Sequence, residues 1–202
     1  MSLGSLPPAV RQPVPSSAGR AWIDRLAHNE CPAFTTRRKR REEYTGASHD
    51  PIVWVEAKGF NVLDADGNRY VDLTGGFGVA LLGHGHPSVV RAVQAQAETL
   101  LHALGDLHPS DRKITLLERL CAIGPWEKTR GMLSLSGSDA IAAALKTAAL
   151  ATGRPGVLAF EGSYHGLGYG ALSVSSYSAR FREPFEAQLN PKVQFAPWPG
   201  DA

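Results

Sequence analysis

A tight Gly-Ser turn between a short apolar run and an alanine-rich stretch constrains the fold of this chain most strongly. Residues 132–135 are apolar except for Ser134, Gly137 and Ser138 form the turn, and residues 140–151 are rich in alanine. Gly153 stands where a glycine follows a helix, and residues 157–160 have the pattern of the next strand. This order predicts a βαβ unit with a buried strand at 132–135, and therefore an α/β fold.

The turn at the start of the predicted helix has the chemistry of an anion site. The first amides of a helix have no partner within it and carry partial positive charge. Gly137 lets the backbone come close to a ligand, and the Ser138 hydroxyl can add a hydrogen bond. Taken by itself, the turn is more simply interpreted as the start of a serine-capped helix with nothing bound.

A second glycine-rich segment follows the strand at 157–160 and contains Tyr164 and His165. Ligands of open α/β sheets bind at the carboxyl ends of the strands. The Gly-Ser turn and this segment both leave strands at that edge, so we expect them to share one crevice. Tyr164 could stack on a planar ring and His165 could bond a substituent of it. The alternative is a tyrosine in the core beside a surface histidine.

Three stretches together resemble the class III (ornithine/4-aminobutyrate-type) aminotransferases, which use pyridoxal 5′-phosphate (PLP) on the type I fold. They are residues 51–87, which end in Gly83-His84-Gly85-His86-Pro87; residues 136–146, which begin Ser136-Gly137-Ser138-Asp139-Ala140; and residues 152–166, which include Phe160-Glu161-Gly162-Ser163-Tyr164-His165-Gly166. The likeness runs from about residue 50 to the end, in the family's order and spacing.

The resemblance assigns roles to four residues of the predicted crevice. It implies that Gly137 and Ser138 hold the cofactor phosphate, that Tyr164 stacks on the pyridine ring, and that His165 lies beside the ring. Asp139 stands where the family usually has glutamate, and we give it no catalytic role. The implied fold is an incomplete type I PLP-dependent transferase fold of the α/β class, with a small-domain meander and the first part of the large mixed-sheet domain.

A β-meander is predicted for residues 52–73, with 65–68 as its hairpin turn, and a flexible glycine loop follows at 74–79. The resemblance implies that Phe77, Gly78 and Val79 border the substrate pocket, often across a dimer interface. From the residues alone, packing of Phe77 under the loop is the simpler interpretation.

The domain organisation follows from these assignments. Residues 1–19 are rich in Pro and Ser and lack an apolar core segment, which predicts a disordered lead and no signal peptide. Residues 20–86 are expected to form an N-terminal segment with the meander. Residues 87–202 are expected to form the first part of the PLP-binding large domain, truncated at its C-terminal end.

Transamination needs a lysine that forms an imine with the cofactor and a carboxylate on the pyridine nitrogen. In the family both come after the region that this chain resembles. None of the six lysines has the matching context; they are Lys39, Lys58, Lys113, Lys128, Lys146 and Lys192. We therefore expect the N-terminal part of an aminotransferase, with no catalytic residue of its own and no activity by itself. The alternatives are a non-catalytic fragment or binding partner that keeps part of the crevice, and a PLP-dependent aminomutase.

The implied partners are an amino donor, a keto acid or aldehyde, and a second copy of the complete protein. The stretch 140–151 is apolar almost all round, so it needs cover on more than one side, which fits a homodimer. The net charge of the chain is only +2, and the basic run at 37–41 is followed directly by Glu42 and Glu43. A solvated helix face therefore explains that run better than a nucleic-acid site.

His84 and His86 could suggest a metal site, but no third ligand is evident, and Pro87 suits the first turn of a helix. We interpret the two histidines as turn and capping residues and expect no metal. No stretch is apolar enough to span a membrane. Cys31 and Cys121 lie far apart, which is typical of reduced thiols in a cytoplasmic protein.

Overall fold

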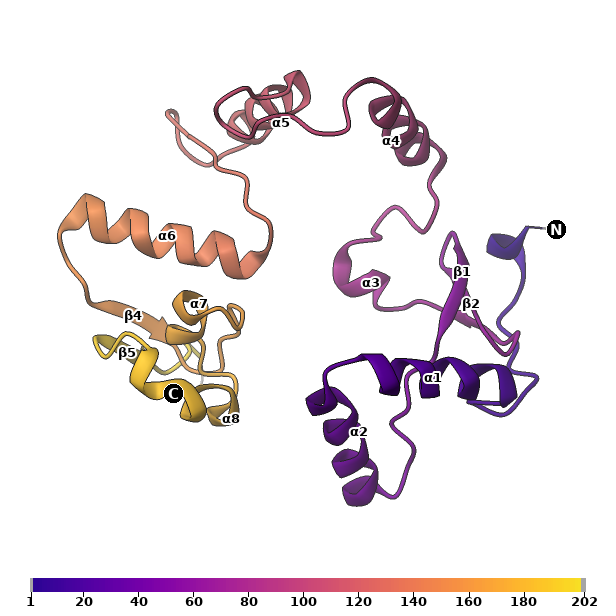
Figure 1. The fold of residues 1–202 in the computed structure, drawn as a ribbon. Coiled ribbons are helices and arrows are strands. Elements are labelled where there is room, and N and C mark those ends of the chain that lie inside the picture. Colours follow the sequence, from indigo (N-terminus) through magenta and orange to yellow (C-terminus); the bar gives the residue numbers. More distant parts are fainter. Residues whose placement is uncertain (1, 201–202) are drawn as a thin grey trace. The chain divides into compact units, whose positions relative to one another are not determined.

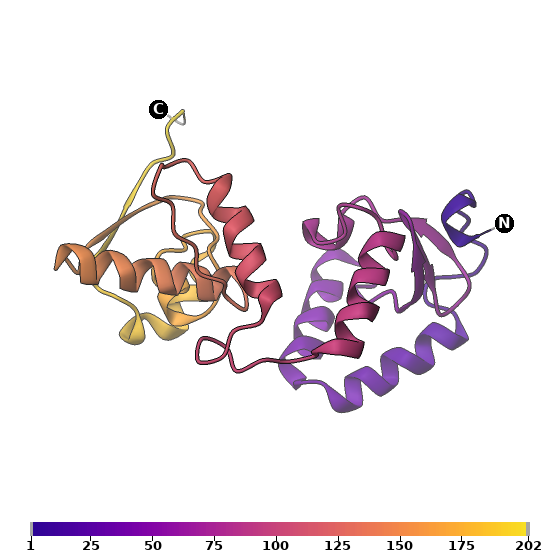
Figure 2. The same ribbon diagram turned by 90° about the horizontal axis from the view of Figure 1, so that it is seen from above.

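The computed structural model describes residues 2–200, and the chain divides into two compact units, Met1–His102 and Ala103–Ala202. The first unit runs from indigo to magenta in Figures 1 and 2, and the second ends in yellow. Each unit is described by itself. The domain boundary predicted between residues 86 and 87 falls inside the first unit.

The first unit is built on a three-stranded antiparallel sheet in the order β1-β2-β3. Its elements are η1 (Leu3–Ser5, a 3-10 turn), α1 (Ser17–Asn29), α2 (Pro32–Thr45), β1 (Trp54–Lys58), β2 (Asn61–Asp64), β3 (Arg69–Val71), α3 (Gly75–Gly78) and α4 (Pro87–Thr99). The meander predicted over residues 52–73 is confirmed, as is its turn at 65–68, where the Gly67 amide donates to the Asp64 carbonyl.

The N-terminal residues pack along the meander. The backbones of Ala9 and Arg69 exchange two hydrogen bonds of 2.8 and 2.9 Å. The buried Asn68 side chain accepts from the Arg11 amide at 2.7 Å, and the Asp66 carboxylate accepts from the Ser16 amide at 2.9 Å. These contacts differ from the disordered lead predicted for residues 1–19. Their partners lie 50 to 60 residues away, so local composition does not reveal them.

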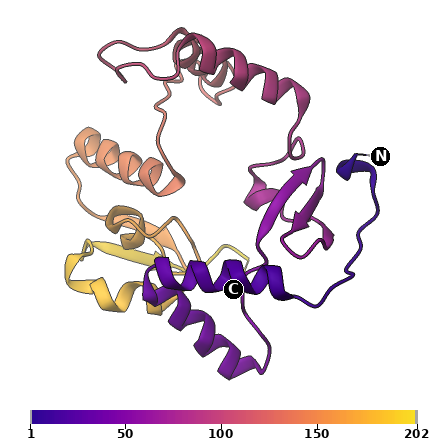
Figure 3. The same ribbon diagram turned by 45° about the vertical axis from the view of Figure 1, so that its right-hand side comes forward.

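Helix α2 carries the basic run at 37–41 and extends from the end of α1 away from the meander (Figures 1 and 3). It has no buried residue, and within the run Arg38 pairs with Glu30. This placement on an exposed helix agrees with the solvated face that the neighbouring acids predict.

The second unit combines a parallel strand pair with helices. Its elements are α5 (Asp111–Ala122), α6 (Gly137–Thr152), β4 (Val157–Phe160), α7 (Tyr169–Ser173), α8 (Ala179–Arg182), the 3-10 segment η2 (Glu183–Gln188) and β5 (Val193–Ala196). The predicted helix and following strand are confirmed as α6 and β4. Gly153 ends α6 in the left-handed conformation, with φ +66°.

The buried strand predicted at residues 132–135 is wrong. These residues have no strand conformation, and Leu135 is 100% exposed. A strand exists only where a neighbour supplies hydrogen bonds, and none of the strands described pairs with this run. The parallel pair is instead β4 and β5, with Val157 opposite Val193, and α7, α8 and η2 lie between them in the chain.

Helix α7 forms the packed centre of the second unit and contacts α6, as Figure 1 shows. Ala171, Leu172 and Val174 are buried, as is Ala159 of β4. Helix α6, in contrast, has no buried residue, and a cavity of about 590 Å³ lies between it and the segments around β4. The segment that follows β4 is therefore more deeply buried than helix α6.

Candidate functional site

The start of α6 is fixed by two side chains that cap it. The Ser136 hydroxyl accepts from the Asp139 amide at 3.1 Å, and the Asp139 carboxylate accepts from the Leu135 amide at 3.1 Å. This exchange is a variant of the capping box. Asp139 therefore reaches back toward the preceding chain and serves to cap α6.

The amides of Gly137 and Ser138 remain available at the helix start. They are the first two amides of α6, and they find no acceptor among the residues that the structure describes. A Cβ atom built on Gly137 would meet nothing within 4 Å, so the space beside it is open. Two free N–H groups with the adjacent Ser138 hydroxyl make a donor set suited to an anion.

The segment after β4 lies directly against this turn. The Gly168 amide donates to the Ser138 hydroxyl at 3.1 Å. A Cβ atom on Gly166 would lie only 2.5 Å from the Cβ of Ser138. The structure thus brings together the two segments that the sequence placed at one crevice.

The buried Ser175 and the side chain of Arg182 stabilise the same segment, which follows β4. The Ser175 hydroxyl accepts from the His165 amide at 2.9 Å and donates to the Ala171 carbonyl at 2.8 Å. The Arg182 guanidinium donates to the carbonyls of Leu172, Ser173 and Ser175 at 2.8–3.1 Å. Sequence reasoning singled out neither residue, because the groups that they bond are brought to them only by the fold.

The Tyr164 side chain is 57% exposed, and its ring meets the Tyr177 ring edge-on, with centroids 6.1 Å apart and planes at 80°. A tyrosine in the core, the alternative from the sequence, is therefore wrong. His165 is half-buried, with its amide held by Ser175. The tyrosine ring remains accessible to a planar ligand.

The glycine loop belongs to the first unit and is anchored at its base by Asp72, whose side chain is only 2% exposed. Its carboxylate accepts from the Thr74 hydroxyl at 2.7 Å, the Gly76 amide at 3.0 Å and His84 Nε2 at 2.8 Å. The hydrogen bond from Thr74, followed by that from His84, lowers the pKa of Asp72 to about 2.

The tip of the glycine loop presents its side chains to solvent. Phe77 is 98% exposed and Val79 is 88% exposed, so packing of Phe77 under the loop is wrong. Phe77 also has φ +58°, a left-handed conformation that is unfavourable for a bulky residue. Strained backbone of this kind concentrates at ligand sites and switch regions.

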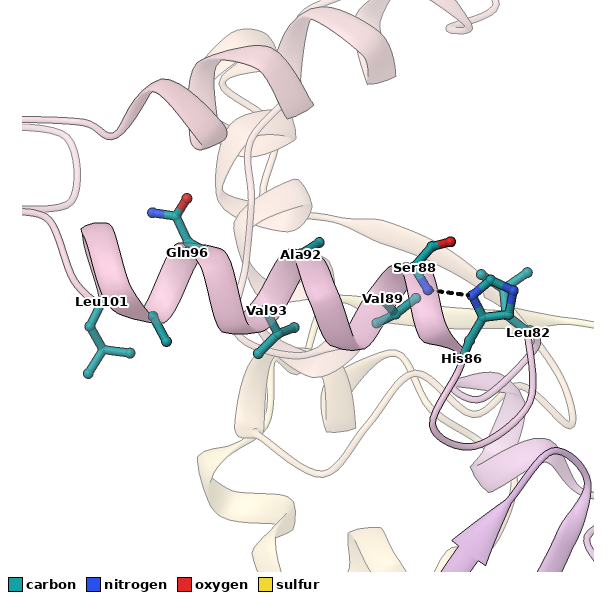
Figure 4. Close-up of a pocket in the computed structure, with 9 residues that line it drawn as sticks. Leu82, His86, Ser88, Val89, Ala92, Val93, Gln96 and Leu101 are labelled. Atoms are coloured by element: carbon teal, nitrogen blue, oxygen red, sulfur yellow. Dashed lines mark hydrogen bonds between the residues drawn. The ribbon is translucent and has the colours of Figure 1, made fainter. Parts of the chain in front are cut away.

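The turn that precedes α4 uses both of its histidines structurally. His84 bonds Asp72, and His86 Nδ1 accepts from the Ser88 amide at 3.3 Å, which caps α4 (Figure 4). The predicted turn and capping roles are confirmed. Within residues 2–200 no group of three His, Cys, Asp or Glu side chains is arranged to hold a metal ion.

An apolar groove of about 540 Å³ runs along α4. Val89, Val93 and Leu101 point to the same side of the helix in Figure 4, and Gln96 points away from them. All three apolar side chains are exposed. Among the described helices, none is both long and apolar enough to cross a membrane.

Comparison with known proteins gives a consistent picture. Residues 44–202 match the family "Aminotransferase class-III". The chain is 35% identical over 164 residues to an alanine/serine racemase of Pyrococcus horikoshii, covering 80% of this chain and 34% of the relative. It is 38% identical over 148 residues to an acetylornithine aminotransferase of Methanosarcina mazei, covering 73% of this chain and 36% of the relative.

Among solved structures, the fold matches taurine:2-oxoglutarate aminotransferase from Bifidobacterium kashiwanohense, in complex with PLP and glutamate. The TM-score is 0.68 at 26% identity, over 82% of this chain and 38% of that one. It also matches a PLP-bound amine transaminase from an uncultivated Pseudomonas species, with TM-score 0.66 at 30% identity, over 74% and 35% of the two chains. The chain thus spans about a third of the length of the curated relatives described above.

Proposed function

The chain belongs to the class III aminotransferases and has part of their type I fold, and from this premise we propose that it holds PLP for amino transfer. The substrates in this proposal are an amino donor and a keto acid or aldehyde. One observation carries it. The free amides of Gly137 and Ser138 and the Ser138 hydroxyl lie at the start of α6, and the hydroxyl contacts the segment that bears the exposed Tyr164.

The residues present fit the cofactor. The amides of Gly137 and Ser138 and the Ser138 hydroxyl are donors, which a phosphate needs, and the open space at Gly137 admits it. Tyr164 would cover one face of the pyridine ring and keep water from it, and His165 would lie beside the ring. When bound, PLP supplies an electron sink that stabilises negative charge at the substrate carbon.

The imine-forming lysine is proposed to come from polypeptide other than these 202 residues. Lys146 follows Ser138 by eight residues on α6, which is roughly 12 Å along the helix axis and too far to share the phosphate turn. Lys58 and Lys113 bond backbone carbonyls of Gly85 and Gly105 at 2.9 and 3.0 Å. We therefore assign no catalytic residue to this chain and expect it to be inactive as a transaminase by itself.

The glycine loop is proposed to border the substrate pocket through Phe77, Gly78 and Val79, next to a second copy of the complete protein. The support is the exposure of two apolar side chains on a strained loop whose base is anchored by Asp72. A cytoplasmic location stays a prediction, which the two free cysteines support.

A second function, racemisation on the same cofactor, is favoured by one observation, since a relative with 35% identity is an alanine/serine racemase. The phosphate and ring contacts proposed above would serve either reaction. An aminomutase or a non-catalytic binding partner would keep the same contacts. The choice among these depends on residues that contact the substrate and the imine.

Substitution of Tyr164 tests the proposed function. PLP affinity and absorbance are measured on the chain and on Tyr164→Ala and Tyr164→Phe. Loss of the ring in Tyr164→Ala should weaken binding by about 1 kcal/mol and shift the cofactor absorbance, because stacked rings contribute about this much. Tyr164→Phe keeps the ring and should match the original chain. If Tyr164→Ala leaves both affinity and spectrum unchanged, the proposed site is wrong.

A further inference from the structure

The position of the Ser138 hydroxyl is set by the segment after β4. Gly168 donates its amide to Ser138 Oγ at 3.1 Å across thirty residues of chain. Gly166 closes the other side, since a Cβ there would lie 2.9 Å from the Cα of Ser138. The hydroxyl is therefore held by a contact from outside its own helix.

The direction of this hydrogen bond determines which further hydrogen bonds the Ser138 hydroxyl can make. A serine hydroxyl has one proton to donate and two lone pairs that accept. The Gly168 amide occupies one lone pair, and the part of the chain that the structure describes offers no acceptor for the proton. The proton thus remains available to a ligand that accepts hydrogen bonds, as phosphate oxygens do.

Residue 168 must lack a side chain for this arrangement to persist. A Cβ on Gly168 would lie 2.9 Å from Ser138 Oγ, which is closer than real Cβ atoms approach. The hydroxyl can rotate away, so an alanine at 168 is expected to fold but to turn the serine out of position. The same change at Gly166 would instead press on the backbone of Ser138, so it is less informative.

We propose that Gly168 is a positioning residue for Ser138, holding the hydroxyl as an acceptor so that its proton points to the cofactor phosphate. This inference rests on the proposed function, because it assigns a task to the same turn. It predicts that Gly168 contributes to ligand binding only when the ligand carries a phosphate and Ser138 is present.

The test uses pyridoxine 5′-phosphate, which lacks the aldehyde and so forms no imine with the six lysines, and pyridoxine, which also lacks the phosphate. Binding to the 202-residue chain is followed by fluorescence and by phosphorus NMR of the ligand. Ser138→Ala and Gly168→Ala should each weaken binding of the phosphate ligand by about tenfold or more. The double variant should bind like Ser138→Ala, because no hydroxyl remains to be positioned. Pyridoxine binding should stay unchanged throughout.

Gly156→Ala is the matched control, because its Cβ would meet only an ordinary contact of 3.6 Å. If Gly168→Ala binds normally while Ser138→Ala is weak, or if the two effects add, the positioning role is overturned and the proposed function stands. If the chain does not bind the phosphate ligand, or Ser138→Ala has no effect, both are overturned. Should Gly168→Ala unfold, hydrogen exchange of the Gly168 amide decides: it should accelerate in Ser138→Ala, and an unchanged rate overturns the proposal.

Discussion

At the scale of single residues, Phe77 is the side chain whose conformation is least favourable. Its φ of +58° costs a non-glycine residue about 1–2 kcal/mol, and its 98% exposure means that little packing is lost on removal. Phe77→Gly should therefore stabilise the glycine loop by up to about 1 kcal/mol, even though glycine adds chain entropy. Hydrogen exchange of the Gly78 and Ala80 amides, which bond Thr74 and Gly75, measures the free energy of local opening.

Val79 supplies the control for this prediction, because it is also largely exposed but has φ −79°, an ordinary helical value. Val79→Gly should destabilise the loop by roughly 0.5–1 kcal/mol, the usual cost of glycine in an ordered segment. If both substitutions destabilise the loop alike, the left-handed conformation of Phe77 is not a source of strain.

Asp72 gives the same loop a dependence on pH. Its pKa is lowered to about 2 by the Thr74 hydroxyl and then by His84, below its ordinary value of 3.8. A lowered folded-state pKa contributes stability that is present above about pH 4 and is lost as the pH falls toward 2. Protection of the Gly76 amide, corrected for intrinsic exchange rates, should fall across this window. It should be low at all pH values in Asp72→Asn.

Asp24→Asn, on the exposed face of α1, is the control for this dependence of Gly76 protection on pH. It should reproduce the pH profile of the original chain at Gly76. Unaltered protection of Gly76 in Asp72→Asn would show that the carboxylate does not hold the base of the loop.

At the scale of elements, Arg182 stabilises the C-terminal end of α7. Its guanidinium bonds three carbonyls at the end of this helix and lies 4.9 Å from the centroid of the Phe195 ring. Arg182→Met keeps an apolar stem on Phe195 but removes all three bonds. The three bonds share the two protons of Nη1. Because a bond to a charged group contributes about 1.5–3 kcal/mol, opening of the segment should become easier by at least about 1.5 kcal/mol.

Exchange of the His165 amide reports this change, because Ser175 joins that amide to the end of α7. Arg180→Met is the control, since Arg180 is exposed on the same short helix α8. Equal exchange at His165 in the two variants would mean that Arg182 does not support the candidate site.

The elements also show what local sequence patterns could predict. Helix α6, its closing Gly153 and the meander each follow from spacing and turn residues within one continuous stretch of chain, and all were predicted. The strand predicted at 132–135 is absent, because a strand depends on a partner that the run itself does not specify. Gly168 was missed for the same reason, because its bond to Ser138 crosses 30 residues of chain. The bonds of Arg182 cross only 7–10 residues, but they depend on how the chain turns back after α7, which no local pattern specifies.

At the scale of the whole molecule, the exposed surface is much larger than that of a compact protein of the same mass. Its accessible surface is 15405 Å², whereas a compact protein of 21.6 kDa exposes about 9,200 Å². The excess of about 6,000 Å² is several times the roughly 600–1,500 Å² of a usual inter-domain interface. Exposed apolar side chains on α4, with Leu135 and Leu150, contribute to it.

Such a surface predicts that the 202-residue chain associates when it is prepared by itself, since contiguous exposed apolar patches drive association. Light scattering should give a mass above 21.6 kDa, and thermal unfolding should lack a sharp cooperative transition. Val93→Glu, in the α4 groove, should reduce association more than Gln94→Glu, which lies outside the groove on the same helix. A monomer whose calorimetric and van't Hoff enthalpies agree would show that the chain is a self-sufficient folding unit. It would also remove the support that the exposed surface gives to the view that further polypeptide covers it.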